Sequence, residues 1–155
     1  MTPVRWGILS TAKIGTQRAI PGMLKSSLLQ VAALASRSLP AAQEAAAALG
    51  IPRAYGSYDA LLADPAIEAV YNPLPNHLHV PLTLAAAQAG KHVLCEKPIA
   101  MNAAEHRTHT IAVERSRTGP GVIVLSVVTV RLAATPSIRR PFLPALVSAP
   151  CADFR

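Results

Sequence analysis

The sequence predicts an α/β protein built on a doubly wound parallel sheet. Between residues 4 and 94, short apolar runs alternate strictly with longer helical patterns, which is typical of right-handed strand–helix–strand units. Apolar residues make up 51% of the chain and aromatic residues only 4%, so small and branched aliphatic side chains must fill the interior. At 155 residues, the chain is long enough to bury the core of one domain.

The apolar runs and stop signals define the expected elements. Pro40 suits the first position of a helix, and Gly50 and Gly90 suit helix ends. The helix after the first strand contains Pro21 and Gly22, and we expect it to be interrupted there. The expected strands are 4–9, 28–35, 54–56, 67–71 and 92–94, and the expected helices are 14–25, 41–49, 58–63 and 79–89.

The segments that follow each strand carry the functional information. In open parallel sheets, ligands bind beyond the carboxyl ends of the strands. The segments at those positions are 10–15, 36–38, 72–79 and 95–98, and they contain the unusual polar residues of the chain.

The turn after the first strand has the spacing of a dinucleotide fingerprint. Ser10, Ala12 and Gly15 occupy its three small-residue positions, and small residues let the backbone approach a pyrophosphate at a helix N-terminus. Ser10 and Ala12 replace the first two glycines, so an ordinary strand-to-helix turn is the alternative. The position after the first strand favours a Rossmann-type nucleotide site.

The end of the second strand favours NADP over NAD. The fingerprint expects an acidic residue there to bind the ribose hydroxyls, but this chain has Ser36, Arg37 and Ser38. Arginine and hydroxyl groups bind a 2′-phosphate through charge-assisted hydrogen bonds. A solvated surface arginine is the alternative.

The segment after the fourth strand is stiff and polar. Two prolines restrict it, and Asn76 with two imidazoles supplies hydrogen-bonding groups. His77 and His79 lack a third ligand at a metal-binding spacing, so we expect no metal. His79 also suits the start of the next helix, and that alternative stays open.

Glu96 and Lys97 follow the fifth strand directly. Partial desolvation can lower the pKa of a lysine at this edge, and the lysine can then exchange a proton with a substrate hydroxyl. A surface Glu–Lys pair is the alternative. Cys95 and Cys151 form neither a disulfide framework nor a metal site by their spacing.

Four segments in order, WGILSTAKIG, ASRS, YNPLPNHLH and GKHVLCEKPIA, resemble the Gfo/Idh/MocA family, from about residue 4 to 105. The branch they resemble most contains dihydrodiol dehydrogenases and NADP-dependent xylose dehydrogenases. The resemblance implies an NAD(P)-dependent oxidoreductase that acts by hydride transfer on a sugar, polyol or diol.

The family's roles extend residue by residue to this chain. Lys97 is the implied catalytic residue, in proton transfer, and Glu96 would help to hold the nicotinamide ribose. Asn76 and His79 would flank the nicotinamide end. The implied cofactor-binding residues are Ser10, Thr11, Ala12, Lys13, Ile14 and Gly15 at the pyrophosphate, Ser36 and Arg37 at the ribose phosphate, and Pro73, Leu74, Asn76, His79, Glu96 and Lys97.

The net charge of +7 belongs mainly to the C-terminal third. Residues 1–106 hold 8 Lys or Arg and 6 Asp or Glu, whereas residues 107–155 hold 7 Arg and 2 acidic residues. Neither a basic stripe nor stacking aromatics accompany this charge, so we expect no nucleic-acid partner. The longest apolar stretch, 121–130, is too short to cross a membrane. Without a signal peptide, we expect a cytoplasmic protein.

The C-terminal residues depart from the family pattern. We assign residues 1–120 to the NAD(P)-binding domain, with a helix over 106–117, and residues 121–155 to a sixth strand near 121–132 plus an irregular Pro/Arg-rich tail. A lysine-free sequence of this composition is typical of GC-rich DNA that is translated out of frame. We therefore hypothesise a frameshift or truncation near 105–120. Family members continue with a second α+β domain, which supplies the substrate pocket, and we expect it to be missing here.

Two functions therefore stay open. The first is a dehydrogenase of this family, with weak or no turnover by this chain alone, because little would hold a substrate for hydride transfer. The second is a cofactor-binding module without catalysis, or an inactive fragment. Family members usually associate through the sheet of the second domain, so a homo-oligomer also stays open.

Overall fold

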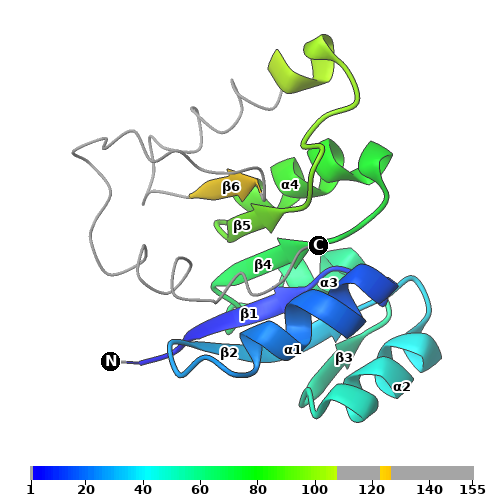
Figure 1. Cartoon of the computed structure of the whole chain (residues 1–155), viewed down its shortest axis with the longest axis vertical. Helices are drawn as coiled ribbons and strands as arrows, with labels where there is room; N and C mark the ends of the chain where they lie inside the picture. Colours follow the sequence, from blue (N-terminus) through cyan, green and yellow to red (C-terminus); the bar gives the residue numbers. More distant parts are fainter. Residues whose placement is uncertain (1, 108–122, 127–155) are drawn as a thin grey trace.

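The computed structural model describes residues 2–107 and 123–126, which form one six-stranded sheet with helices on both sides (Figure 1). Every pair of neighbouring strands runs parallel. The order across the sheet is β3-β2-β1-β4-β5-β6, the doubly wound order, and it confirms the predicted fold class. The strands are β1 (Val4–Ile8), β2 (Leu29–Ala35), β3 (Arg53–Tyr55), β4 (Ala69–Asn72), β5 (His92–Cys95) and β6 (Val124–Ser126).

The helices form two layers. In Figure 1, α1 and α2 lie in front of the sheet, and α3 and α4 lie behind it. Right-handed crossovers place helices on both faces in this way, because the chain winds in opposite directions from β1. The helical elements are η1 (Gly15–Ala19), α1 (Ile20–Met23), α2 (Leu39–Leu49), α3 (Tyr58–Leu62), η2 (Asn76–Leu78) and α4 (His79–Gln88).

Each face of the sheet has its own apolar core. Trp6 and Ile8 of β1 pack with Ile20 and Ala46 on the α1/α2 side. Leu9, Val70, Leu61 and Ala86 belong to the core on the α3/α4 side. Successive strand residues point to opposite faces, so both faces of the central strands are buried, as expected of a parallel sheet.

Serine side chains cap the starts of two helices, and Gly50 ends α2 as the sequence predicts. The Ser38 hydroxyl accepts a hydrogen bond from the Ala41 N–H at the start of α2, and the Ser57 hydroxyl does the same for α3. Gly50 ends α2 with a φ of 66°, a conformation that glycine adopts without steric cost.

The first helix differs from the expectation. It runs without a break over 13–23, and the expected interruption near Pro21 and Gly22 is wrong. The irregularity lies one turn earlier, where residues Gly15–Ala19 are π-helical and the Ile20 N–H donates to the Gly15 carbonyl. Pro21 has no N–H for the carbonyl one turn before it, and a wider turn accommodates that loss.

Other element boundaries also differ from the expectation by a small number of residues. The third strand begins at Arg53 rather than at 54, and the fourth strand covers Ala69–Asn72 rather than 67–71. The helix expected over 106–117 begins earlier, at 103, because the Asn102 side chain accepts a hydrogen bond from the Glu105 N–H. The parts of that helix and of the expected sixth strand at 108–122 and 127–132 lie outside the described residues.

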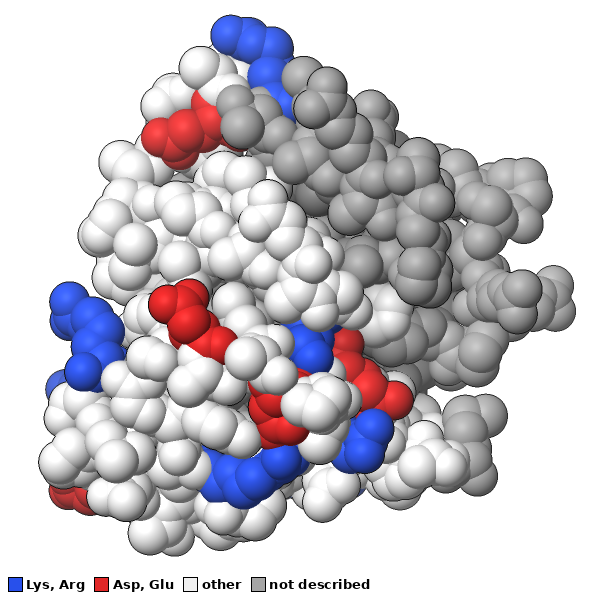
Figure 2. Space-filling view, turned by 180° about the vertical axis from the view of Figure 1, so that it is seen from behind, with Lys and Arg blue, Asp and Glu red and all other residues white. Residues whose placement is uncertain are grey.

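Charges of both signs are interspersed on the face opposite to that of Figure 1, as Figure 2 shows for the described residues. On this face, the described residues form no basic stripe of the kind that is typical of nucleic-acid recognition. Among the helices of the described residues, none is long and apolar enough to cross a membrane.

A histidine joins β6 to the rest of the sheet. The Ile123 N–H donates to the Nδ1 atom of His92 over 3.1 Å, and the Val93 N–H donates to the Ile123 carbonyl over 2.8 Å. Burial lowers the pKa of His92 below its ordinary 6.5, although the Glu68 carboxylate opposes the shift. The ring must be neutral at Nδ1 to accept this hydrogen bond.

The first prediction concerns the acid sensitivity of this junction. Unfolded His92 takes up a proton near its ordinary pKa, whereas the folded protein takes it up only at lower pH, so the free energy of unfolding falls as the pH drops below about 6.5. His92→Asn places an acceptor oxygen near the Nδ1 position without titrating, and we expect a smaller decline. Urea unfolding followed by the fluorescence of Trp6 measures it at about pH 7 and pH 5.5.

The matched control is His77→Asn, because His77 is an exposed imidazole of the loop after β4. This variant should show the same decline as the unsubstituted chain. An equal decline in His92→Asn would contradict the role assigned to His92.

Candidate functional site

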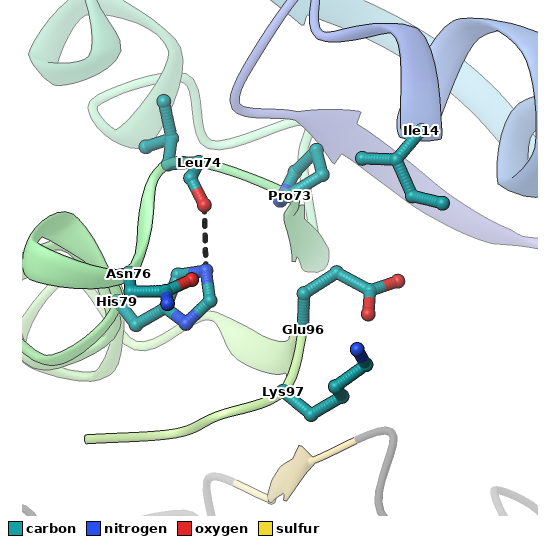
Figure 3. Close-up of a pocket in the computed structure, with 7 residues that line it drawn as sticks. All are labelled: Ile14, Pro73, Leu74, Asn76, His79, Glu96 and Lys97. Carbon is teal, nitrogen blue, oxygen red and sulfur yellow. Dashed lines mark hydrogen bonds between the residues drawn. The ribbon is translucent and has the colours of Figure 1, made fainter. Parts of the chain in front are cut away.

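Three strand ends meet around one pocket. β1 leads to β2 on one side of the sheet, and β4 pairs with β1 on the other side, so the segments that leave β1 and β4 diverge at this point. The pocket has a volume of about 180 Å³, which suits one end of a dinucleotide rather than a whole one. Its lining residues are Ile14 after β1, Pro73, Leu74, Asn76 and His79 after β4, and Glu96 and Lys97 after β5 (Figure 3).

The turn after β1 is shaped by its own serine. The buried Ser10 hydroxyl accepts a hydrogen bond from the Ala12 N–H over 2.9 Å, so this side chain fixes the turn. Thr11 and Ala12 are half-buried, and Lys13 is exposed. The exposed side chain of Ile14 (44%) reaches the pocket, which gives that wall an aliphatic surface.

Gly15 brings the first helix against the end of β4. A Cβ atom at this position would lie 3.3 Å from Pro73 Cγ and 3.8 Å from Tyr71 Cε1. The first contact is tighter than an ordinary van der Waals separation, so the glycine permits the close approach.

Asn72 folds the loop after β4. Its buried amide donates to the His79 carbonyl and the Thr83 hydroxyl, and its carbonyl oxygen accepts from the Leu74 N–H. These three contacts satisfy a polar group that would otherwise be costly to bury. The loop therefore reaches the pocket in one defined conformation.

His79 links the two later loops. Its ring, which is 1% exposed, places Nε2 2.6 Å from the Leu74 carbonyl oxygen and Nδ1 2.6 Å from the Pro98 carbonyl oxygen. Figure 3 shows the contact with Leu74. Both nitrogens face backbone oxygens, so this ring orders the site and has no nitrogen left for a ligand.

Glu96 and Lys97 extend into the pocket from the end of β5 (Figure 3). The Glu96 N–H donates to the Asn72 carbonyl over 3.0 Å, which continues the pairing of β4 with β5 by one residue. The Tyr71 hydroxyl donates to Glu96 Oε1 over 2.5 Å. Glu96 is half-buried and Lys97 is exposed at the rim.

Two neighbouring groups remain protonated at neutral pH. Burial, together with the Glu96 carboxylate, raises the pKa of the Tyr71 phenol far above its ordinary value. Burial also raises the pKa of the Cys95 thiol to about 11, so this cysteine is not an activated nucleophile.

Ser36 and Arg37 lie at the same edge of the sheet, at the end of β2, but they do not line the pocket. Arg37 is exposed. The Ser36 hydroxyl oxygen accepts from the Ser38 N–H over 3.4 Å, which leaves its O–H as a donor. Ser10, Thr11, Ala12, Lys13 and Gly15 likewise stand outside the lining. Within the described ranges, no group of three His, Cys, Asp or Glu side chains suits a metal ion.

Comparison with known proteins agrees with this arrangement. The family model described as "Oxidoreductase family, NAD-binding Rossmann fold" (Gfo/Idh/MocA) matches residues 4–119. The chain belongs to this family. The match extends beyond residue 105, where the resemblance of the motifs ends.

The similar proteins include two named dehydrogenases. The chain is 53% identical over 100 residues to D-xylose 1-dehydrogenase (NADP(+)) 2 of Haloferax volcanii, and this match covers 64% of this chain and 30% of that protein. It is 45% identical over 105 residues to trans-1,2-dihydrobenzene-1,2-diol dehydrogenase of Mus musculus, and that match covers 67% of this chain and 32% of the mouse protein. The chain thus spans about a third of the length of the curated relatives it matches.

A solved structure shares the fold. The 3-ketoreductase KijD10 of Actinomadura kijaniata, in complex with TDP-benzene and NADP, superposes with a TM-score of 0.74 at 31% identity. The match covers 81% of this chain and 38% of KijD10. These findings support an NAD(P)-binding Rossmann domain.

Sequence reasoning did not single out Tyr71 or Asn72. The sequence pattern places Tyr71 at the end of a strand and Asn72 at the start of a loop, yet both carry buried polar groups with partners in the site. A tyrosine in a strand buried on both faces needs a partner for its hydroxyl, and that requirement is the signal that points to Tyr71.

The second prediction tests the close approach at Gly15. Gly15→Ala adds a methyl group against Pro73 and should cost about 1–3 kcal/mol by overpacking, partly offset by a better helix propensity. Gly22→Ala is the matched control, because nothing lies within 4 Å of its added Cβ. The control should be neutral or stabilising, and urea unfolding compares the two variants. Equal stability of Gly15→Ala and Gly22→Ala would contradict the assignment.

Proposed function

We propose that this chain is the cofactor-binding part of an oxidoreductase that prefers NADP and acts on a sugar, polyol or diol. The observation that carries the proposal is the pocket at the divergence of β1 and β4, where Glu96 and Lys97 face the aliphatic wall of Ile14. An aliphatic surface beside a carboxylate and an ammonium group suits a nicotinamide riboside.

The turn after β1 suits a pyrophosphate. The first turn of the helix over 13–23 has backbone N–H groups without intrahelical partners and the positive end of the helix dipole. Ser10 fixes the turn from within, and the small side chain of Ala12 lets phosphate oxygens approach. Lys13 adds a positive charge at the same place.

The end of β2 suits the adenosine ribose with a 2′-phosphate. Arg37 offers a planar fork of donors, and the O–H of Ser36 is available as a donor. The three residues after the strand, Ser36–Ser38, include no acidic side chain that would repel a phosphate. The preference for NADP over NAD rests on these groups.

At the nicotinamide end, four of the lining residues have distinct tasks. Ile14 packs against one face of the ring and excludes water from it. The Glu96 carboxylate accepts hydrogen bonds from ribose hydroxyls, and Asn76 offers an amide at the pocket wall. When bound, the cofactor accepts or donates a hydride. Lys97 Nζ exchanges a proton with the substrate hydroxyl or carbonyl oxygen.

A binding module without catalysis is the second candidate. The Lys97 side chain is exposed, and an exposed lysine is a less effective general acid–base group than one in a closed site. The two candidates differ in turnover and share cofactor binding.

The third prediction tests the cofactor preference. Quenching of Trp6 fluorescence should show tighter binding of NADPH than of NADH. Arg37→Ala should weaken NADPH binding about tenfold, because charge-assisted hydrogen bonds to the phosphate are lost, and should leave NADH binding unchanged.

Lys25→Ala is the control for Arg37→Ala. Lys25 is an exposed cation between α1 and β2, at the opposite edge of the sheet, so its removal changes the net charge equally. The preference for NADP would be contradicted if NADH bound as tightly as NADPH. It would also be contradicted if Arg37→Ala weakened the binding of both ligands equally.

The fourth prediction tests the role of Lys97. The initial rate of change of nicotinamide absorbance with a panel of sugars, polyols and diols measures turnover. Lys97→Met should lower turnover by about a hundredfold or more, the usual contribution of a general acid–base group, and change NADPH affinity by less than about threefold.

The outcomes separate the two candidates. Turnover that persists in Lys97→Met removes Lys97 from the mechanism. Tight NADPH binding with no turnover on any compound of the panel supports the binding module instead of the enzyme.

A further inference from the structure

Tyr71 contacts two of the three segments that build the site. It is the third residue of β4 and is 1% exposed. Its ring edge faces Gly15, where an added Cβ would lie 3.8 Å from Cε1. Its hydroxyl donates to Glu96 Oε1 over 2.5 Å. The phenol therefore joins the helix of the pyrophosphate turn to the carboxylate at the end of β5.

The backbone around this contact is already fixed. Asn72 of β4 pairs with Cys95 of β5, and the Glu96 N–H donates to the Asn72 carbonyl over 3.0 Å. Glu96 therefore leaves the sheet at a defined point, and only its side-chain torsions remain to be set. A glutamate side chain loses rotamer entropy when it is ordered.

The hydroxyl orders the carboxylate before a ligand arrives. A carboxylate can accept several hydrogen bonds, so a donor on Oε1 leaves Oε2 and the remaining lone pairs for other donors. Burial keeps the phenol protonated, and it acts as a permanent donor. The two hydroxyls of a ribose are donors that match an ordered carboxylate.

We propose that Tyr71 is a positioning residue that orients the Glu96 carboxylate for the hydroxyls of the nicotinamide ribose. This inference rests on the proposed cofactor-binding function. Tyr71 touches the cofactor only through Glu96, so its contribution should vanish when Glu96 is absent.

The fifth prediction is a double-mutant cycle on NADPH affinity. Tyr71→Phe removes one hydroxyl and keeps the ring that packs near Gly15. We expect NADPH to bind about fivefold more weakly to this variant, because the carboxylate is no longer preorganised. In a Glu96→Ala background, the same change should alter NADPH affinity by less than about twofold.

A second ligand separates positioning from a general structural role. Adenosine 2′,5′-bisphosphate lacks the nicotinamide ribose, and its affinity should be the same in Tyr71→Phe and in the unsubstituted chain. Tyr55→Phe is the matched control, since it also removes a phenol–carboxylate hydrogen bond, that of Tyr55 with Asp64 over 2.8 Å, away from the pocket lining. This control should change neither affinity.

Each outcome decides the proposal. Three results would overturn the positioning role. Tyr71→Phe could weaken the binding of both ligands equally, it could weaken the binding of neither, or it could weaken NADPH binding by the same factor with and without Glu96. A Tyr71→Phe chain that does not fold would assign the hydroxyl to the fold and would also overturn it. Failure of the unsubstituted chain to bind NADPH would instead refute the proposed function itself.

Discussion

The parallel pairing of β1 with β4 is the contact on which the site depends. Trp6, Gly7 and Ile8 pair with Ala69, Val70 and Tyr71, and from this pair the chain winds outward in opposite directions. The segments that leave β1 and β4 must therefore separate, and the space between them opens at the carboxyl edge of the sheet. A Cβ at Gly7 would lie 2.6 Å from Leu61 Cδ2, so a side chain at this position would force Leu61 of α3 to shift. α3 packs against the sheet at that point.

The sequence pattern predicts the fold well because the parallel sheet is buried on both faces. Strands such as β2 and β4 read as mostly apolar runs, and Gly50 and Gly90 mark helix ends. The strand ends follow from these runs, so the candidate positions 14, 73–79 and 96–97 could be named from the sequence. Their meeting at one edge needs only parallel strands.

The sequence does not predict which polar groups are already engaged within the protein. The bond between Tyr71 and Glu96 depends on the register of β4 on β5 and on the pleat, which decides which side chains share a face. The irregular turn at Gly15–Ala19 depends on how the helix accommodates Pro21. Both features arise from packing between segments that lie apart in the chain.

Polar residues of the loops fall into two physical classes, and the difference limits their roles. Ser10, Asn72 and His79 form hydrogen bonds with backbone groups, and a polar group engaged in this way is costly to redirect. Glu96 and Lys97 keep polar atoms toward the pocket. The first class gives the loops one conformation, and the second class is free to meet a ligand. In the function we propose, these groups recognise a ribose and move a proton, tasks common to many CH–OH substrates. Under that proposal, selection among sugars, polyols and diols depends on contacts beyond these seven lining residues.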